Sequence, residues 1–465
     1  MNTNVPVEAD RPQKTPARAW AVLAVTYLAS VAAPMAQFKI PPLSDQIIPQ
    51  LIASGIDAAN VGTYFGLLMT CMTIIGAILA FPAAFICKRF GLKGTVLVSD
   101  ACLAIGGLIA AVFGANHLVL FYASRIIEGV GIGLVGVAAP TCVSIWFPER
   151  TRGRALGIWA TWVPVGCVAM FLIAPYVSAA FGYRTVFWAT AIIAAVAFVA
   201  FALVFTYPEQ DNFYESKEGL AEHEIEVGFI ESLKLLKNKY IWLLGIVFFC
   251  FTFNTLGIVN TYYNTFMTLH GFSATIASNL TSIVTGFGII TAPLSGVIFD
   301  RLKREHKRYL VAAIMAIIMV SVAFMWTSGG VGTAETGVIM TGFAWVSLIV
   351  FLALQSIAGG AGGGGMRPLA PMVMQQSTMG ASIGMAMLQF MQNLGSGLGS
   401  VIFGACIDIT DAATWALPGN LIQIPVCIIA IVCALMINPW SKKNKAKRAA
   451  REAEQDEQAP ATDAS

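Results

Sequence analysis

Long apolar runs alternate with short polar or basic stretches along most of the chain. A helix needs about 20 mostly apolar residues to cross the hydrocarbon core of a bilayer, and many of these runs reach that length. Unbroken apolarity over such a length predicts membrane-spanning helices rather than the elements of a soluble domain. We expect twelve, at 19–40, 60–86, 94–114, 117–147, 153–175, 184–206, 240–267, 274–299, 308–327, 337–376, 380–406 and 418–437.

Composition supports this prediction. Asp, Glu, Lys and Arg make up 11% of the 465 residues, against about 25% in an ordinary soluble domain. So few charges cannot cover a water-soluble protein, which excludes a soluble enzyme and a nucleic-acid binder. The sequence has neither a phosphate-binding loop pattern nor a metal-ligand cluster, and its nine cysteines lack CxxC spacing. We therefore expect no enzymatic activity, no cofactor and no metal.

The basic residues predict the topology. If the N-terminus is cytoplasmic, 24 of the 28 Lys and Arg residues fall in cytoplasmic segments, and Lys39 and Arg184 fall on the other side. Arg125 and Arg367 fall within helices. The positive-inside rule then places both termini in the cytoplasm. The first apolar run lacks a small-residue cleavage site, so we expect it to be a retained first helix of a plasma-membrane protein.

The longest internal polar segment divides the predicted helices into six and six. Its last part, from Phe229, has helical apolar spacing and predicts a short surface helix. The expected organisation is a cytoplasmic tail (1–18), a six-helix bundle (19–206), a central cytoplasmic loop (207–239), a second six-helix bundle (240–437) and a cytoplasmic tail (438–465).

The two halves contain an internal repeat. Gly129–Pro140 and Gly360–Pro371 both carry a series of glycines followed by a proline, and their alignment puts Arg367 opposite Gly136. Short basic hairpins follow the second helix of each half. Two related six-helix halves with such hairpins are typical of a secondary transporter that works by rocking.

Three short motifs lie at corresponding places in this plan. They are Lys88-Arg89-Phe90-Gly91 after the second helix, Arg125-Ile126-Ile127-Glu128-Gly129 in the fourth, and Phe299-Asp300-Arg301-Leu302-Lys303-Arg304 after the eighth. In this order and spacing they resemble motifs of the major facilitator superfamily, although the Asp usual in the first turn is missing.

The resemblance implies an all-α polytopic membrane protein with twelve transmembrane helices in two pseudo-symmetric six-helix bundles. It also implies a chain that functions as a monomer. The residues that it marks for gating are Lys88, Arg89, Asp300 and Arg301. The glycines of 359–365 and the stretch Gln392–Gly399 are similar to cyanate-permease-like and oxalate/formate-antiporter-like organic anion carriers. The helix 8 Arg and helix 11 Lys of oxalate carriers are missing.

Arg367 is the first candidate for binding cargo. The repeat places it inside the tenth helix, where a cation without a partner costs about 2.5–3.5 kcal/mol. No acid of the second half is well placed to pair with it, so an anionic cargo is a plausible counter-ion. The alternative is that the helix bends after Gly365 and Arg367 lies at the cytoplasmic interface.

Other polar residues lie on helices that line the central cavity in the similar family, or next to them. Cargo contact is expected for Tyr27, Gln37, Asn254, Asn260, Tyr263, Gln389 and Asn393. The alternative is that these side chains only bond neighbouring helices.

Four charged residues of the first half carry further hypotheses. Arg125 and Glu128 share a helix face and are candidates for proton coupling; the alternative is a fixed structural pair. Asp100 is expected to pair with basic residues of the nearby loop. Lys39 is expected at the outer mouth, where it either attracts anions or extends to the interface.

The sequence thus predicts a carrier that moves a small organic anion, a carboxylate in particular, by alternating access. Proton symport or anion exchange would drive it, and its partners would be the cargo, protons or a counter-transported anion, and the bilayer. The alternative cargo is a neutral or amphipathic organic compound, including one removed by efflux. A non-transporting membrane sensor is less favoured because the loops are short and carry no signalling domain.

Overall fold

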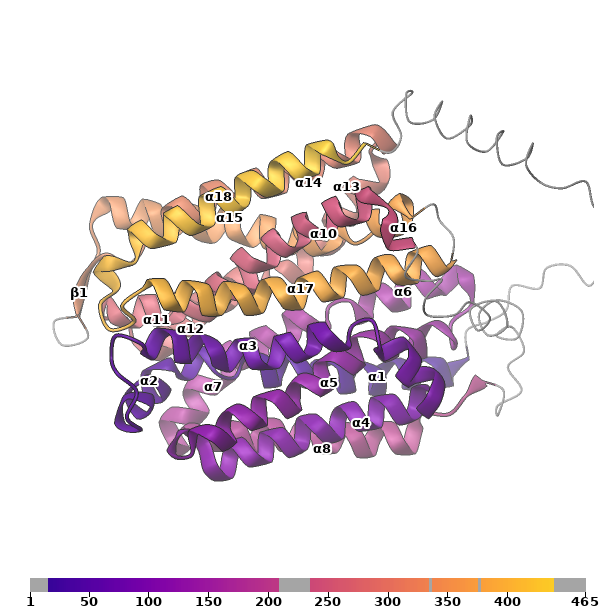
Figure 1. The fold of residues 1–465 in the computed structure, drawn as a ribbon, viewed down its shortest axis with the longest axis horizontal. Coiled ribbons are helices and arrows are strands. Elements are labelled where there is room, and N and C mark those ends of the chain that lie inside the picture. The colour runs from indigo at the N-terminus through magenta and orange to yellow at the C-terminus, as the bar shows by residue number, and fades with distance from the viewer. Residues whose placement is uncertain (1–15, 209–234, 334–336, 375–377, 439–465) are drawn as a thin grey trace, which may run out of the picture.

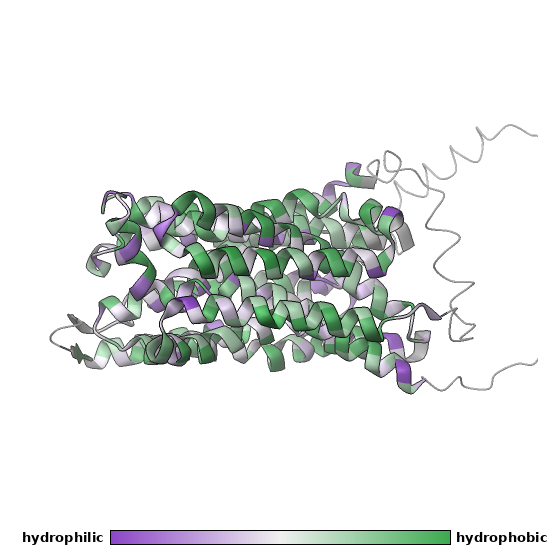
Figure 2. Ribbon diagram, turned by 90° about the horizontal axis from the view of Figure 1, so that it is seen from below, coloured by the Kyte–Doolittle hydropathy of each residue, from purple (hydrophilic) through white to green (hydrophobic). Residues whose placement is uncertain are grey.

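The computed structural model describes residues 16–208, 235–333, 337–374 and 378–438. Long helices run along one axis of the molecule, and α1 begins at the same end of the bundle at which α18 ends (Figure 1). The strand β1 marks the opposite end, called the β1 end below. Hydrophobic residues cover the lengths of the helices, and hydrophilic residues gather near their ends (Figure 2). Such a bundle presents to a bilayer the apolar sides that it requires.

The first half is entirely helical where it is described. Its α-helices are α1 (Ala17–Phe38), α2 (Ser44–Ala53), α3 (Val61–Leu79), α4 (Ala83–Phe113), α5 (Leu118–Ser144), α6 (Glu149–Trp159), α7 (Trp162–Phe181) and α8 (Tyr183–Val204), with 3-10 turns η1 (Pro41–Leu43) and η2 (Gly114–Asn116).

The second half adds one two-stranded hairpin to its helices. The helices are α10 (Lys239–Thr252), α11 (Asn260–Leu269), α12 (Ala274–Gly286), α13 (Gly288–Arg301), α14 (Lys307–Met325), α15 (Gly342–Met366), α16 (Leu369–Val373), α17 (Thr378–Cys406) and α18 (Ala416–Met436). A π-helical segment, η6 (Phe253–Val259), joins α10 to α11, and short 3-10 turns are η5 (Leu235–Lys237), η7 (Arg304–His306) and η8 (Ala412–Thr414). The strands are β1 (Val331–Thr333) and β2 (Gly337–Ile339), which pair antiparallel.

The membrane-spanning prediction agrees with this structure. In the described chain, eleven helical stretches are long and apolar enough to cross a bilayer. The 29-residue helix α17 lies alongside them and packs against α3 and α10. Each of the twelve predicted segments therefore coincides with a long helix or with two helices in succession.

Local sequence explains several helix ends. Asn238, Ser273 and Thr341 cap the N-termini of α10, α12 and α15, each accepting a hydrogen bond from a backbone N–H of the first turn. Gly182 separates α7 from α8 with a φ of 84°, and Gly91 breaks α4 with a φ of 70°. Both values favour glycine. Gly91 lies in the predicted turn between the second and third spans.

Some predicted boundaries are wrong. The tenth span was expected from residue 337, but β2 occupies Gly337–Ile339 and α15 starts at Gly342. The predicted span 153–175 breaks between α6 and α7, and helix α2 was not predicted. Most of the surface helix expected from Phe229 lies outside the described residues.

Helices α3 and α17 form a close seam between the two halves. Gly62 and Gly66 of α3 face Gly404 and Ser400 of α17, and a Cβ atom added at Gly66 would overlap the Ser400 carbonyl oxygen. Thr70 Oγ1 donates a hydrogen bond of 2.7 Å to the Gly397 carbonyl across the same seam. Small residues and hydroxyl bonds of this kind allow membrane helices to approach closely.

The seam yields a stability prediction. Gly66→Ala should lower the unfolding free energy by about 1–3 kcal/mol, because the new methyl group overlaps the α17 backbone. The melting temperature of the detergent-solubilised protein should fall accordingly. The matched control is Gly153→Ala in α6, where an added Cβ meets no atom within 4 Å. It should leave the melting temperature unchanged or raise it, since alanine favours helix. Equal melting temperatures for the two variants would contradict the close seam.

Candidate functional site

A cluster of three charged side chains is buried in the first half. Glu128 of α5 accepts hydrogen bonds on both carboxylate oxygens, from Arg125 Nη1 one turn earlier and from Lys39 Nζ at the end of α1. Both contacts are ion pairs, and all three side chains have 0% exposed surface. The predicted Arg125–Glu128 pair therefore exists, and it has a third member. These residues are called the charge cluster below.

Arg125 also holds backbone groups of two other helices. Its guanidinium donates to the carbonyls of Ala36 at 2.7 Å and Gln37 at 3.2 Å, both in the last turn of α1. Its Nε donates to the Leu68 carbonyl of α3 at 2.9 Å. Carbonyls in the last turn of a helix lack partners within it, so Arg125 caps α1 and joins it to α3 and α5.

Lys39 corrects an expectation. It was predicted at the outer mouth, exposed to anions or to the interface, but its side chain is fully buried. Beside its bond to Glu128, Nζ lies 3.4 Å from Thr190 Oγ1 and 4.9 Å from the centre of the Phe187 ring, both on α8. The side chain turns inward because a buried carboxylate and an aromatic face stabilise its charge there.

The environment of Asp100 also differs from the prediction. It was expected to pair with basic loop residues, but it is buried in α4 and neither carboxylate oxygen has a hydrogen-bond partner among the described residues. Lys93, the nearest of these basic residues along α4, lies seven residues earlier, which is about 10 Å along a helix. That separation explains why the expected ion pair does not form.

Arg367 lies where the tenth predicted span breaks. Helix α15 ends at Met366, and Arg367 and Pro368 connect it to α16. The guanidinium is partly buried, donates a 2.8 Å hydrogen bond to Gln392 Oε1 of α17, and lies 5.9 Å from the centre of the Phe248 ring. No acidic side chain of the described chain forms an ion pair with it.

Two predicted cargo residues share a face of α17 with Gln392. The amide nitrogens of Gln389 and Asn393 are buried and have no hydrogen-bond partner among the described residues. Gln389 faces Gly136 of α5, and Asn393 faces Gly76 of α3. This polar row on α17 therefore faces the first half of the molecule.

Gln37 connects the polar row to the charge cluster. Its side-chain nitrogen lies 3.5 Å from Ser396 Oγ, one turn beyond Gln392 on α17. Its backbone carbonyl accepts from Arg125. Polar groups thus lie between Arg367 and Glu128 across the interface, with one turn of α17 separating Gln392 from Ser396.

The predicted residues around α11 bond neighbouring helices. Asn254 donates to the Cys250 carbonyl, one turn earlier in its own helical segment, at 3.0 Å, and its nitrogen lies 3.6 Å from Cys427 Sγ of α18. Its Oδ1 has no hydrogen-bond partner among the described residues. Asn260 lies between α7 and α12, and Tyr263 Oη is 3.2 Å from Ser328 Oγ. These contacts fit the interhelical alternative.

The remaining predicted residues lie apart from the charge cluster. Tyr27 of α1 hydrogen-bonds Thr161 Oγ1 at 2.8 Å. Arg89, Asp300 and Arg301 are exposed near helix ends, and none of them forms an ion pair with a described residue. Lys88 lies within α4, but its side chain is outside the described part.

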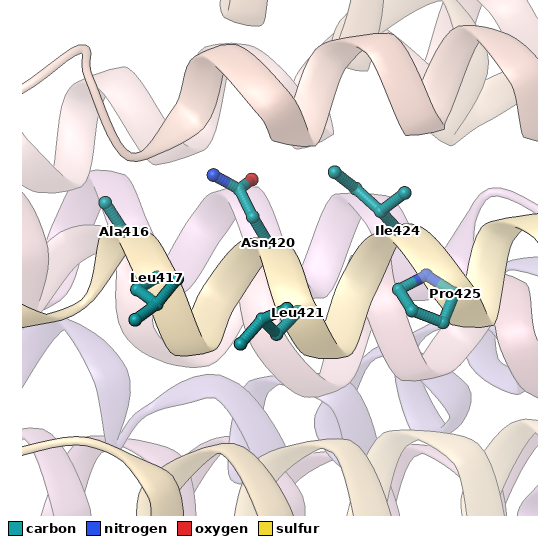
Figure 3. Close-up of a pocket in the computed structure, with 6 residues that line it drawn as sticks. All are labelled: Ala416, Leu417, Asn420, Leu421, Ile424 and Pro425. Atoms are coloured by element: carbon teal, nitrogen blue, oxygen red, sulfur yellow. The ribbon is translucent and has the colours of Figure 1, made fainter.

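A shallow depression lies on the outer face of α18 (Figure 3). Ala416, Leu417, Asn420, Leu421, Ile424 and Pro425 line it. Leu417 and Leu421 are 70% and 65% exposed, as expected for a face toward lipid. Since α18 packs on α10 and α14, this depression is separate from the interface that holds the charged residues.

Sequence reasoning missed the role of Lys39 in this site. The signal available was a single basic residue at the end of the first helix and an acid in the fourth. Only their approach in three dimensions, across 89 positions of the chain, pairs them.

Comparison with known proteins adds independent findings. Residues 21–351 match the family described as Major Facilitator Superfamily. The chain is 36% identical over 105 residues to Myo-inositol transporter 3A of Cryptococcus neoformans var. grubii, covering 22% of this chain and 17% of that protein. It is 26% identical over 301 residues to Multidrug resistance protein 2 of Bacillus subtilis, covering 63% and 69%.

Solved structures agree on the fold. A crystal structure of a D-xylose-proton symporter superposes with a TM-score of 0.68, covering 92% of this chain and 98% of that one. The two sequences are 15% identical, so this likeness concerns the fold alone.

The charge cluster predicts a large effect of Glu128→Gln. Removing the carboxylate leaves Arg125 and Lys39 as two neighbouring cations without exposed surface. Loss of one partner of a buried pair costs roughly 3–5 kcal/mol, so the melting temperature should fall sharply. Glu305→Gln, at an exposed acid in η7, is the control and should not change it. A normal melting temperature for Glu128→Gln would show that the pairs contribute little to stability.

Proposed function

The chain belongs to the Major Facilitator Superfamily, and we propose that it is a secondary transporter for a small organic anion. The preferred cargo is a carboxylate. It moves this cargo across the plasma membrane by alternating access, in symport with protons or in exchange for another anion. It functions as a monomer within the bilayer.

The observation that carries the anion proposal is the environment of Arg367. A guanidinium offers five N–H donors in a planar fork and is always charged. Here its described side-chain partners are one neutral amide and an aromatic ring. Its positive charge is therefore uncompensated by any described acid, and a carboxylate would compensate it with two parallel hydrogen bonds.

The polar row on α17 supplies further donors for such a cargo. The unpartnered amide nitrogens of Gln389 and Asn393 share a helix face with Gln392, which already contacts Arg367. Buried donors without partners are costly, and a bound carboxylate or its substituents would satisfy them. We also propose cargo contact for Tyr27 and Gln37 of α1. The same holds for Asn254 of η6 and for Asn260 and Tyr263 of α11.

Coupling is proposed for Arg125 and Glu128. They lie buried at the junction of α1, α3 and α5, and Gln37 connects them to the polar row of α17. A change of charge in the cluster would thus alter the contact between the two halves. Gating is proposed for the basic and acidic residues at the helix ends, Lys88, Arg89, Asp300 and Arg301.

The finer assignment is also a proposal. The glycine-rich stretch of α15 and the row on α17 favour a carrier of the cyanate-permease-like or oxalate/formate-antiporter-like kind. The related proteins named above are an inositol transporter and a multidrug resistance protein, so they do not decide the cargo. We further propose that 19–206 and 240–437 form the two bundles, joined by 207–239, with tails 1–18 and 438–465 in the cytoplasm.

Substitution of Arg367 tests the cargo. Arg367→Lys keeps the charge but loses the fork, so affinity for a carboxylate should fall strongly. Arg367→Ala should cost more, roughly 2–5 kcal/mol of binding free energy. The measurement is titration calorimetry of the purified protein with formate, oxalate and succinate, with melting temperature as the folding control.

Arg304→Ala, at an exposed arginine in η7, is the matched control and should bind like the wild type. If Arg367→Ala folds and binds the same carboxylates equally well, Arg367 does not hold the anion. That result would favour a neutral or amphipathic cargo.

Orientation is tested with single cysteines in a variant that lacks the nine native ones. Asp57 and Glu305 are exposed at opposite ends of the bundle, before α3 and before α14. In intact cells, a membrane-impermeant maleimide should label Asp57→Cys and spare Glu305→Cys, because the positive-inside rule places the β1 end outside. The reverse labelling pattern would invert the proposed topology.

A further inference from the structure

The charge cluster carries an excess charge. Lys39 and Arg125 contribute two positive charges and Glu128 one negative charge, which leaves a net charge of +1 on three side chains without exposed surface. A net charge within a bilayer is expensive, whereas a balanced pair is much less so. The cluster would become neutral if one cation lost its proton.

The contacts distinguish the three side chains. Arginine stays protonated in proteins, and Arg125 is further held by the carbonyls of Ala36, Gln37 and Leu68. Protonation of Glu128 would raise the net charge to +2 and release both ion pairs. Loss of the proton from Lys39 instead leaves the neutral Arg125–Glu128 pair.

The surroundings of Lys39 add no competing charge. The titratable groups that it meets are Glu128 directly and Arg125 through it, both from α5, while α8 presents the neutral Thr190 and Phe187. No ion pair joins Lys39 to the other acidic or basic side chains described on α1 and the helices packed against it. These are Arg18, Arg89, Lys93, Asp100, Arg152, Arg154 and Arg184.

We propose that Lys39 is the proton-binding group of this transporter, an inference that rests on the proposed proton-coupled function. In the step, one N–H bond of the ammonium breaks, the electron pair stays on nitrogen, and the proton passes to water that reaches Nζ when the two halves change position. The side chain changes from +1 to neutral, and the cluster from +1 to zero. Glu128 stays ionised and keeps its bond to Arg125.

The position of Lys39 connects this step to movement of the two halves. Two residues later, the Pro41 carbonyl accepts a 3.0 Å hydrogen bond from Asn264 of α11, and Asn264 Oδ1 accepts from Ser278 of α12. Lys39 therefore lies between α1 and the residues through which the two halves contact each other at the β1 end. A weaker Lys39–Glu128 bond would allow the end of α1 to move relative to α5.

The first test needs no cargo. Lys39→Met mimics the neutral form, so it should melt within a few degrees of the wild type, whereas Glu128→Gln should melt far lower. The double variant returns the net charge from +2 to +1 and should melt above Glu128→Gln alone. If Lys39→Met melts as low as Glu128→Gln, the fold requires the ammonium charge and the proposal is wrong, whatever the cargo.

The second test measures protons and cargo together. Proteoliposomes containing the pH dye pyranine receive radiolabelled succinate or oxalate, and the proton-to-tracer ratio is recorded. The wild type and the control Lys237→Met, at an exposed lysine of η5, should share one ratio. In Lys39→Met and Lys39→Arg, proton movement should fall to the level of empty vesicles, since neither side chain exchanges a proton. The proton-to-tracer ratio should therefore fall toward zero.

The outcomes separate the two proposals. An unchanged ratio in both Lys39 variants would place the proton elsewhere while leaving the carrier function intact. If the wild type moves neither tracer, the proposed anionic cargo is wrong, and the melting temperatures still decide whether the fold tolerates a neutral Lys39.

Discussion

Glu128 is the acid on which the first half of this molecule depends, because it balances two cations whose side chains have no exposed surface in this structure. Arg125 could not reach the carbonyls at the end of α1 and in α3 if its charge were unpaired, and Lys39 could not turn inward at all. In a bilayer, a polar group must find its partner within the protein. One carboxylate therefore fixes the relative positions of α1, α3, α5 and the start of η1.

The interface between the halves follows a different rule. Along α3 and α17 the residues are small, so the backbones approach until hydroxyl groups bond carbonyls of the opposite helix. Such contacts contribute little individually and can be exchanged for others. The polar row on α17 lies in this same interface. A transporter needs such an arrangement, since its halves must separate and close again while each keeps its own internal packing.

The charge cluster and Arg367 are separated by few side chains. From Arg367 to Glu128, the path passes through Gln392, one helical turn to Ser396, and then Gln37. The side chain of Gln37 is one of those proposed to contact cargo. Its backbone carbonyl accepts a hydrogen bond from Arg125 of the charge cluster. The proposed coupling requires two sites that bias one common element, and under this proposal the end of α1 is that element.

The sequence by itself determined the class of protein, the number of long helices and the nearness of Arg125 to Glu128, since apolar run length and i, i+3 spacing are local properties. It could not place Lys39 or Asp100, and it left open whether Arg367 lies inside the tenth helix or beyond a bend after Gly365. Residue 39 meets residue 128 only after α1, α5 and α8 pack together, and the end of α15 at Met366 follows from Pro368 and the approach of α17. The partner of a buried polar group is decided by tertiary packing, because a short-range charge interaction depends on distance in space and not on separation along the chain.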